Sequence, residues 1–124
     1  MAYIGPGTIV SRDTRITGHA RVDGKAKVFG YAWVFSYAWV TGGALVTGRA
    51  QVFGHATVCE KARMCQFARV YGNAQVKGDA FLCGTAKIGG DAVILGGEWD
   101  GSEGEILSGT WTSPDVFGCI EEVG

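Results

Sequence analysis

The chain has 124 residues, of which 12 are acidic, 11 are Lys or Arg and 21 are Gly. This length suits one domain with a modest core and leaves no room for a catalytic domain beside a regulatory one. No apolar run approaches the ~18–20 residues of a membrane span, and the first residues lack the basic start and apolar stretch of a signal peptide. We therefore expect a soluble, cytoplasmic protein whose four cysteines are free thiols.

Charge is divided unequally along the chain. Residues 1–94 carry all 11 basic side chains and five acidic ones (+6), whereas residues 95–124 carry seven acidic side chains and no Lys or Arg (−7). A basic body attracts anions. Alternatively, the acidic segment folds back and neutralises the body of its own chain or of a neighbouring subunit. The split divides the chain into a body, residues 1–94, and an acidic segment, residues 95–124.

The body is a sequence repeat. From Gly5 to Ile94 it consists of fifteen consecutive hexads with the pattern x-G-x-A-x-V and no insertion. The fourth position is Ala in thirteen hexads, and the sixth is Val in ten. The second position is Gly in ten hexads, and its exceptions are Pro6, Arg12, Ser36, Glu60 and Gln66. A register kept over this length indicates a repeat protein.

Each hexad alternates between two kinds of position. Positions four and six are small or aliphatic, whereas positions three and five are polar or variable. This period of two predicts a short strand with one buried face, because an amphipathic helix needs a spacing of 3.6 residues. Gly at position two fits a tight turn with positive φ. We expect each hexad to form a strand and a corner, with strands stacked about 4.8 Å apart because none is stable alone.

The hexads, such as TGRAQV and FGHATV, resemble those of the hexapeptide-repeat family over residues 5–94. The resemblance implies an all-β fold, a left-handed parallel β-helix of triangular section in which three hexads make one 18-residue coil. Fifteen hexads then make about five coils. The V-x-G-x-A variant is similar to small repeat proteins encoded by bacteria and their phages. The resemblance also implies a homo-oligomer, most often a trimer in this family.

With an 18-residue coil, residues 18 positions apart should stack in columns. Cys65 and Cys83 then share one corner column. The adjoining hexads FGYAWV and FSYAWV direct six aromatic side chains outward: Phe29, Tyr31, Trp33, Phe35, Tyr37 and Trp39. A contiguous apolar patch of this kind marks an interface or a ligand site. In one interpretation these side chains hold subunits together or lie beneath the acidic segment.

In the other interpretation the patch binds a ligand, with aromatic rings stacked on planar groups and Arg side chains on phosphate. The candidate ligand-binding residues are Arg15, Arg21, Tyr31, Trp33, Tyr37, Trp39, Arg49, His55 and Arg69. The two interpretations are compatible. They predict a non-enzymatic, homo-oligomeric binding protein that captures a small anionic, nucleotide-like molecule at grooves between subunits, with neither a membrane nor a long nucleic acid as partner. By analogy with phage-encoded repeat proteins, it would act as a sponge for a host nucleotide signal.

The resemblance also raises acyl transfer as an alternative function. Acyltransferases of the family use a His as general base, and His19 and His55 are the only candidates. The chain lacks the loop that interrupts the repeats in such enzymes. The two His lie two coils apart, about 9.6 Å, which excludes a shared zinc ion. We therefore predict no catalytic residue, no metal and no cofactor. A purely structural scaffold is a third alternative.

The repeat ends after Ile94. Short strands are expected near 97–100 and 105–112. A stacked coil leaves an open end with unpaired backbone groups, which needs a cap. We predict that residues 95–124 cap the C-terminal end or cross to a neighbouring subunit and insert Trp99 or Trp111. At the other end, Met1 to Ile4 provides thin cover.

Overall fold

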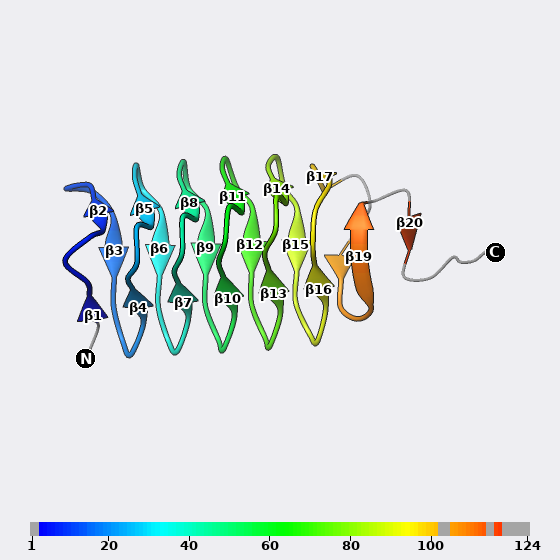
Figure 1. Cartoon of the computed structure of the whole chain (residues 1–124), viewed down its shortest axis with the longest axis horizontal. Helices are drawn as coiled ribbons and strands as arrows, with labels where there is room; N and C mark the ends of the chain where they lie inside the picture. Colours follow the sequence, from blue (N-terminus) through cyan, green and yellow to red (C-terminus); the bar gives the residue numbers. More distant parts are fainter. Residues whose placement is uncertain (1–2, 102–104, 114–115, 118–124) are drawn as a thin grey trace.

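The computed structural model describes residues 3–101, 105–113 and 116–117, and shows an elongated, all-β parallel solenoid (Figure 1). The described residues form twenty short strands and no helix. They accordingly contain no helix of the length and hydropathy that would be needed to cross a membrane. The strands follow one another along the long axis in chain order, coil by coil (Figure 1).

The strands form three sheets, one along each side of the coil. Sheet A contains β1 (Tyr3–Ile4), β4 (Arg21–Val22), β7 (Trp39–Val40), β10 (Thr57–Val58), β13 (Gln75–Val76), β16 (Val93–Ile94), β19 (Thr110–Ser113) and β20 (Val116–Phe117). Sheet B contains β2 (Ile9–Val10), β5 (Lys27–Val28), β8 (Leu45–Val46), β11 (Arg63–Met64), β14 (Phe81–Leu82) and β17 (Glu98–Trp99). Sheet C contains β3 (Arg15–Ile16), β6 (Trp33–Val34), β9 (Gln51–Val52), β12 (Arg69–Val70), β15 (Lys87–Ile88) and β18 (Glu105–Ile106).

Strand pairing confirms the predicted coil of three hexads. Neighbouring strands of the repeat region are parallel and come from successive coils. Paired residues are 18 positions apart, as for Arg21 with Trp39 and Val22 with Val40. Residues at equivalent positions of successive coils therefore stack in columns.

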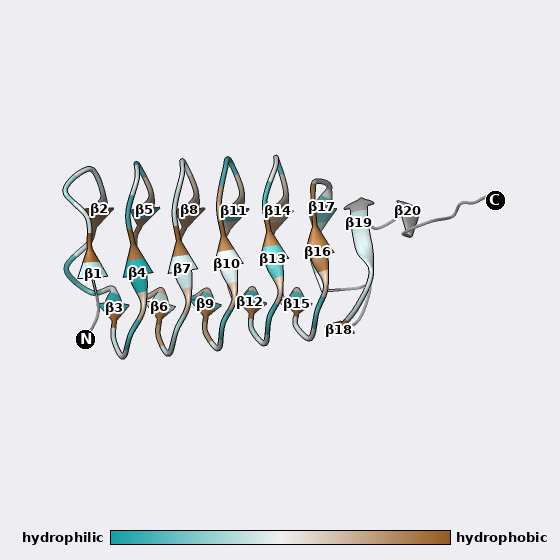
Figure 2. Ribbon diagram, turned by 60° about the horizontal axis from the view of Figure 1, so that its bottom comes forward, coloured by the Kyte–Doolittle hydropathy of each residue, from teal (hydrophilic) through white to brown (hydrophobic). Residues whose placement is uncertain are grey.

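The burial of each hexad follows its alternation. The strand consists of the fifth and sixth residues, and the fourth and sixth residues face inward. From Ala20 to Ile94, these inward side chains are at most 1% exposed. In Figure 2 the colour changes from teal to brown within β4, from Arg21 to Val22. Burial of each Val removes apolar surface from water and contributes about 1.5–3 kcal/mol.

The corners need a left-handed backbone at the second residue of most hexads. Gly42 has φ 65°, and a Cβ there would lie 2.7 Å from the backbone nitrogen of Glu60 in the next coil. Glu60 and Gln66 adopt φ 60° and 56° although they carry side chains. Their side-chain oxygens accept hydrogen bonds from the backbone nitrogens of Gly78 (2.9 Å) and Gly84 (2.6 Å) in the next coil. These bonds offset the cost of the left-handed conformation.

The solenoid has six coils rather than the predicted five. The fifteen hexads form β2–β16, Tyr3–Ile4 adds β1, and the acidic segment adds β17 and β18. The coil continues past the repeat because Trp99 and Ile106 take the inward aliphatic place, with 0% and 7% exposure. Strands were predicted near 97–100 and 105–112, where β17, β18 and most of β19 lie. The described part of the acidic segment thus stacks on the body of its own chain, with Trp99 inserted there.

The two ends of the solenoid differ. At the C-terminal end, β20 pairs antiparallel with β19, and the ring of Trp111 meets Trp99 edge-on at a centroid distance of 5.4 Å. At the N-terminal end, β1, β2 and β3 are the last strands of their sheets. Ile4 is 50% exposed there, so the cover is thin, as predicted. Met1 and residues 118–124 lie outside the described residues.

Candidate anion-binding groove

The structure divides the nine predicted binding residues among three places. Sheet C carries Arg15 on β3 and Trp33 on β6, with Tyr31 and Arg49 at the corners before β6 and β9. Sheet A carries Arg21 on β4 and Trp39 on β7, with Tyr37 and His55 at the corners before β7 and β10. Arg69 lies on β12, farther along sheet C. One chain therefore does not gather all nine residues into a single site.

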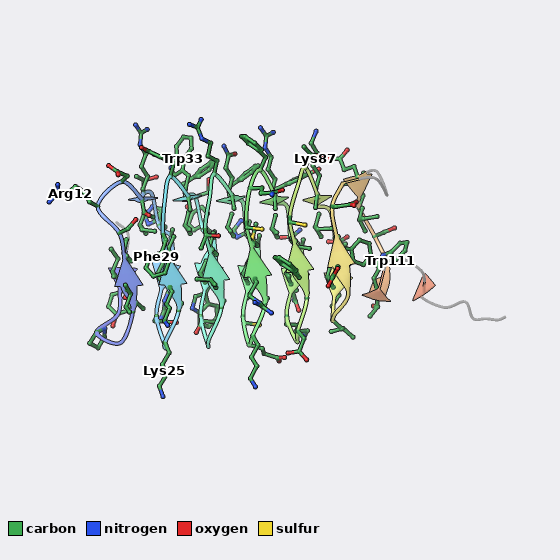
Figure 3. All side chains as sticks on the ribbon, turned by 90° about the horizontal axis from the view of Figure 1, so that it is seen from above. Arg12, Lys25, Phe29, Trp33, Lys87 and Trp111 are labelled. Atoms are coloured by element: carbon green, nitrogen blue, oxygen red, sulfur yellow. The ribbon has the colours of Figure 1, made fainter. Side chains whose placement is uncertain are left out.

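The four residues at the start of sheet C line an open groove of about 290 Å³. The complete lining, which we call the groove, is Asp13, Arg15, Tyr31, Trp33, Arg49 and Gln51. These residues come from the third and fifth positions of hexads in three successive coils, whose strands are about 4.8 Å apart. Figure 3 shows Trp33 projecting from the side of the solenoid.

Each arginine of the groove lies over an aromatic ring of a neighbouring coil. The Cζ atom of Arg15 is 5.8 Å from the Trp33 ring centroid, and that of Arg49 is 5.4 Å from the Tyr31 centroid. Trp33 is held further by Nε1, which donates a hydrogen bond to Thr17 Oγ1 at 3.2 Å. Cation–π attraction and this bond position the rings and guanidinium groups together.

The groove keeps two positive charges available. Within the described part of the chain, the guanidinium that forms an ion pair is that of Arg21, and neither Arg15 nor Arg49 pairs with a carboxylate. Asp13 lines the same groove without pairing with either arginine. A guanidinium offers a planar fork of donors that matches the oxygens of phosphate or carboxylate. The groove therefore suits an anion with a planar group.

The corresponding arginine on sheet A is already occupied. Arg21 Cζ lies between two rings, 5.5 Å from the Tyr3 centroid and 5.1 Å from the Trp39 centroid. Arg21 Nη2 also pairs with Asp23 Oδ2 at 3.2 Å, and Trp39 Nε1 donates to Asp23 Oδ1 at 3.0 Å. We call Tyr3, Arg21, Asp23 and Trp39 the Arg21 cluster. Its charges balance, so it ties coils together and offers no free cation.

Asp23 is ionised in this cluster at neutral pH. Its partial burial opposes ionisation, but hydrogen bonds from Thr41 and Trp39 and the charge of Arg21 outweigh burial and hold the pKa of Asp23 below its ordinary value of 3.8. The side chain is only 19% exposed. The carboxylate therefore persists as the acceptor for Trp39 and the counter-charge for Arg21.

Three further rings stack at a corner of sheet A. Successive ring centroids of His19, Tyr37 and His55 are 5.0 and 4.9 Å apart, with interplanar angles of 6° and 4°. Both faces of the Tyr37 ring are covered, so this ring has no free face for stacking on a ligand. The same stack contains both candidate bases of the acyl-transfer alternative, outside the depressions on sheets B and C.

The thiols show the predicted column. Cys65 and Cys83 lie in neighbouring coils and hydrogen-bond to each other. Burial, followed by the effect of Cys83, raises the pKa of Cys65, and burial also raises that of Cys59. Both are therefore poor nucleophiles at neutral pH. Over the described ranges, no three His, Cys, Asp or Glu side chains gather to hold a metal ion. Cys119 lies outside those ranges.

Sequence reasoning missed a larger depression on sheet C. It measures about 480 Å³ and is lined by Phe67, Arg69, Thr85, Lys87, Gly101 and Glu105, of which only Arg69 was singled out. The 18-residue columns already place Arg69 beside Lys87. The contribution of Gly101 and Glu105 had no sequence signal, because the hexad pattern is lost there. A third depression, about 320 Å³, lies on sheet B around Lys27, Lys61 and Arg63.

Comparison of the chain with protein-family models, with curated proteins and with solved structures finds no match.

Proposed function

We propose that this protein is a non-catalytic, homo-oligomeric binding protein of the hexapeptide-repeat family, with a left-handed coil, and that the groove captures a small anionic, nucleotide-like molecule. The observation that carries the proposal is the pair of guanidinium groups, Arg15 and Arg49, that lack a carboxylate partner among the described residues and flank two aromatic side chains. The resemblance to phage-encoded repeat proteins extends the proposal to sequestration of a host nucleotide signal.

The arrangement matches the two parts of a nucleotide. Tyr31 and Trp33 belong to the coil between those of Arg15 and Arg49, so the two cations are about 9.6 Å apart along the solenoid. A planar base packs against the aromatic pair, and its phosphate accepts hydrogen bonds from one or both guanidinium groups.

A second subunit completes the site. The groove, at about 290 Å³, is at the lower limit of small-molecule sites, which are usually concave and enclose most of the ligand. Packing of a neighbouring chain against the outward aromatic side chains of sheets A and C converts the open groove into a closed one. A trimer is the expected assembly. Native mass spectrometry of protein from its source cells reports both the subunit number and any retained small molecule.

The ligand test is a thermal-shift panel of linear and cyclic nucleotides on the assembled protein. Binding to the folded state raises the melting temperature. The double variant Arg15→Gln/Arg49→Gln should lose this shift, whereas Lys25→Gln/Lys61→Gln, which removes the same charge from exposed corners of sheet B, should keep it. No shift with any nucleotide, or an equal loss in both variants, overturns the proposal.

A structural scaffold is the second candidate, and one observation favours it. Each of the five cation–π pairs joins residues 18 positions apart, in adjacent coils. Arg–aromatic columns therefore strengthen the solenoid whether or not a ligand binds. If the protein is only a scaffold, Trp33→Ala and Trp39→Ala break assembly and change no ligand-dependent property.

A further inference from the structure

The depression around Phe67 and Lys87 lies on the same sheet as the groove. It takes its residues from β12, β15 and β18 and from the corners before them, whereas the groove takes its residues from β3, β6 and β9 and their corners. Figure 3 shows Lys87 projecting on the same side of the solenoid as Trp33. The two depressions are therefore successive sites along one face, two to three coils or about 10–14 Å apart.

The second depression offers an uncovered aromatic ring. Phe67 is 58% exposed, and no ring or guanidinium of the described residues lies against it. Tyr37 has both ring faces covered. Phe67 occupies the third hexad position, as Tyr31 does in the groove. Its ring is thus available for stacking on a planar group.

Two positive charges face each other beside that ring. Arg69 and Lys87 are direct partners on neighbouring parallel strands, and both are exposed. No described carboxylate pairs with either of them. Like charges directly opposite each other in a sheet repel, and an anion held between them removes that repulsion. This pair is closer than Arg15 and Arg49, and it suits a single phosphate group.

The remaining residues shape and tune this depression. A Cβ on Gly101 would collide with Thr85 Oγ1, so glycine leaves the corner open beside that hydroxyl. Glu105 lies opposite Lys87 on the next strand, β18. Its carboxylate lowers the positive potential at one edge and therefore opposes anion binding.

We propose that Phe67, Arg69, Thr85 and Lys87 form a second anion-binding site, the distal site, which takes a nucleoside monophosphate with its base on Phe67 and its phosphate between Arg69 and Lys87. The third and fifth positions of a hexad are about 6.6 Å apart along the backbone, a length that a nucleoside spans. The inference rests on the proposed function and adds that each chain binds two molecules on sheet C.

Isothermal titration of the assembled full-length protein with adenosine 5′-monophosphate tests the proposal. Two equivalents per chain are expected. Arg69→Gln/Lys87→Gln should remove one equivalent and Arg15→Gln/Arg49→Gln the other, with the melting temperature unchanged within a few degrees because these side chains are exposed. Glu105→Gln should tighten the distal site severalfold at low salt, and added salt should abolish that gain.

The outcomes separate the two proposals. One equivalent that only Arg15→Gln/Arg49→Gln removes overturns the distal site and leaves the proposed function standing. One equivalent that only Arg69→Gln/Lys87→Gln removes supports the distal site and overturns the groove. No heat of binding, or equal binding of adenosine without its phosphate, overturns both. Equal affinity for inorganic phosphate alone overturns the assignment of Phe67 as a base-stacking residue.

Discussion

Sheets A and C carry the same arrangement with opposite electrostatic results. Each has an Arg, a Trp 18 residues later on the next coil, and a side chain two residues after the Arg that accepts the Trp Nε1 hydrogen bond. On sheet C that acceptor is Thr17, and on sheet A it is Asp23. Both side chains position the indole. Only Asp23 also neutralises the neighbouring guanidinium.

The difference separates stability from binding on a repetitive surface. An Arg–Trp column strengthens the coil on either sheet. The charge of the acceptor beside the Arg then decides whether the guanidinium remains available to an external anion. Variants that alter this acceptor, or the coil that both sheets share, test the comparison.

The largest expected effect comes from the shared solenoid. Trp99→Ala should lower the free energy of unfolding by about 3–5 kcal/mol, because it removes a fully buried indole from the sixth coil. Urea denaturation measures the change. Ligand affinity at the groove, which is formed by the first three coils, should stay the same in the folded variant. Loss of groove binding at temperatures where Trp99→Ala is folded would contradict this separation.

Asp23→Thr gives sheet A the acceptor that sheet C has. It removes the counter-charge of Arg21 and should lower the free energy of unfolding by about 1–2 kcal/mol. Urea denaturation at neutral pH measures it, with Asp91→Asn at an exposed corner as the control. A change no larger than that of the control would show that the Arg21 cluster is not stabilising.

The contribution of Asp23 should also depend on pH. Because the pKa of Asp23 lies below 3.8 in the folded chain, its stabilisation is complete above that ordinary value and is lost as the pH falls through the lower folded pKa. The difference in unfolding free energy between the wild type and Asp23→Thr should therefore be constant near neutral pH and shrink in acid below pH 3.8. A difference that grows on acidification would have the wrong sign.

Thr17→Val should have the smallest effect. It removes an exposed hydrogen bond to Trp33 Nε1, so the free energy of unfolding should fall by about 0.5–1 kcal/mol or less. Ligand affinity at the groove should weaken only slightly, because Arg15 and Arg49 keep their charges. A large loss of affinity in Thr17→Val would mean that the Thr17 hydroxyl itself contacts the ligand.

The regular part of the fold could be predicted because a strict hexad allows only one register. Inward Ala and Val, outward Trp33 and Trp39, and the stacking of Cys65 on Cys83 all follow from positions counted in sixes. The sixth coil could not be predicted from that count. Trp99 replaces an aliphatic residue there, and its strand pairs with β14 at an offset of 17 residues, with Glu98 opposite Phe81.

The candidate site was predictable in composition and not in grouping. Columns of 18 residues identify which side chains are neighbours within a sheet, so Arg15 with Trp33 could be read from the sequence. The neutralisation of Arg21 depends on a rotamer that brings its guanidinium back to Asp23, and the covered faces of Tyr37 depend on the stacking angles of two imidazoles. Side-chain conformations of this kind are not encoded in a periodic pattern.

The most direct measurement is isothermal titration of Thr17→Asp with the nucleotide that gives the largest thermal shift. The substitution gives sheet C the acceptor of sheet A and places a carboxylate beside Arg15. We predict an unchanged or slightly higher melting temperature and an affinity at the groove at least about tenfold weaker, equivalent to about 1.4 kcal/mol. Unchanged affinity in a folded Thr17→Asp variant would contradict the claim that free guanidinium charge on sheet C binds the ligand.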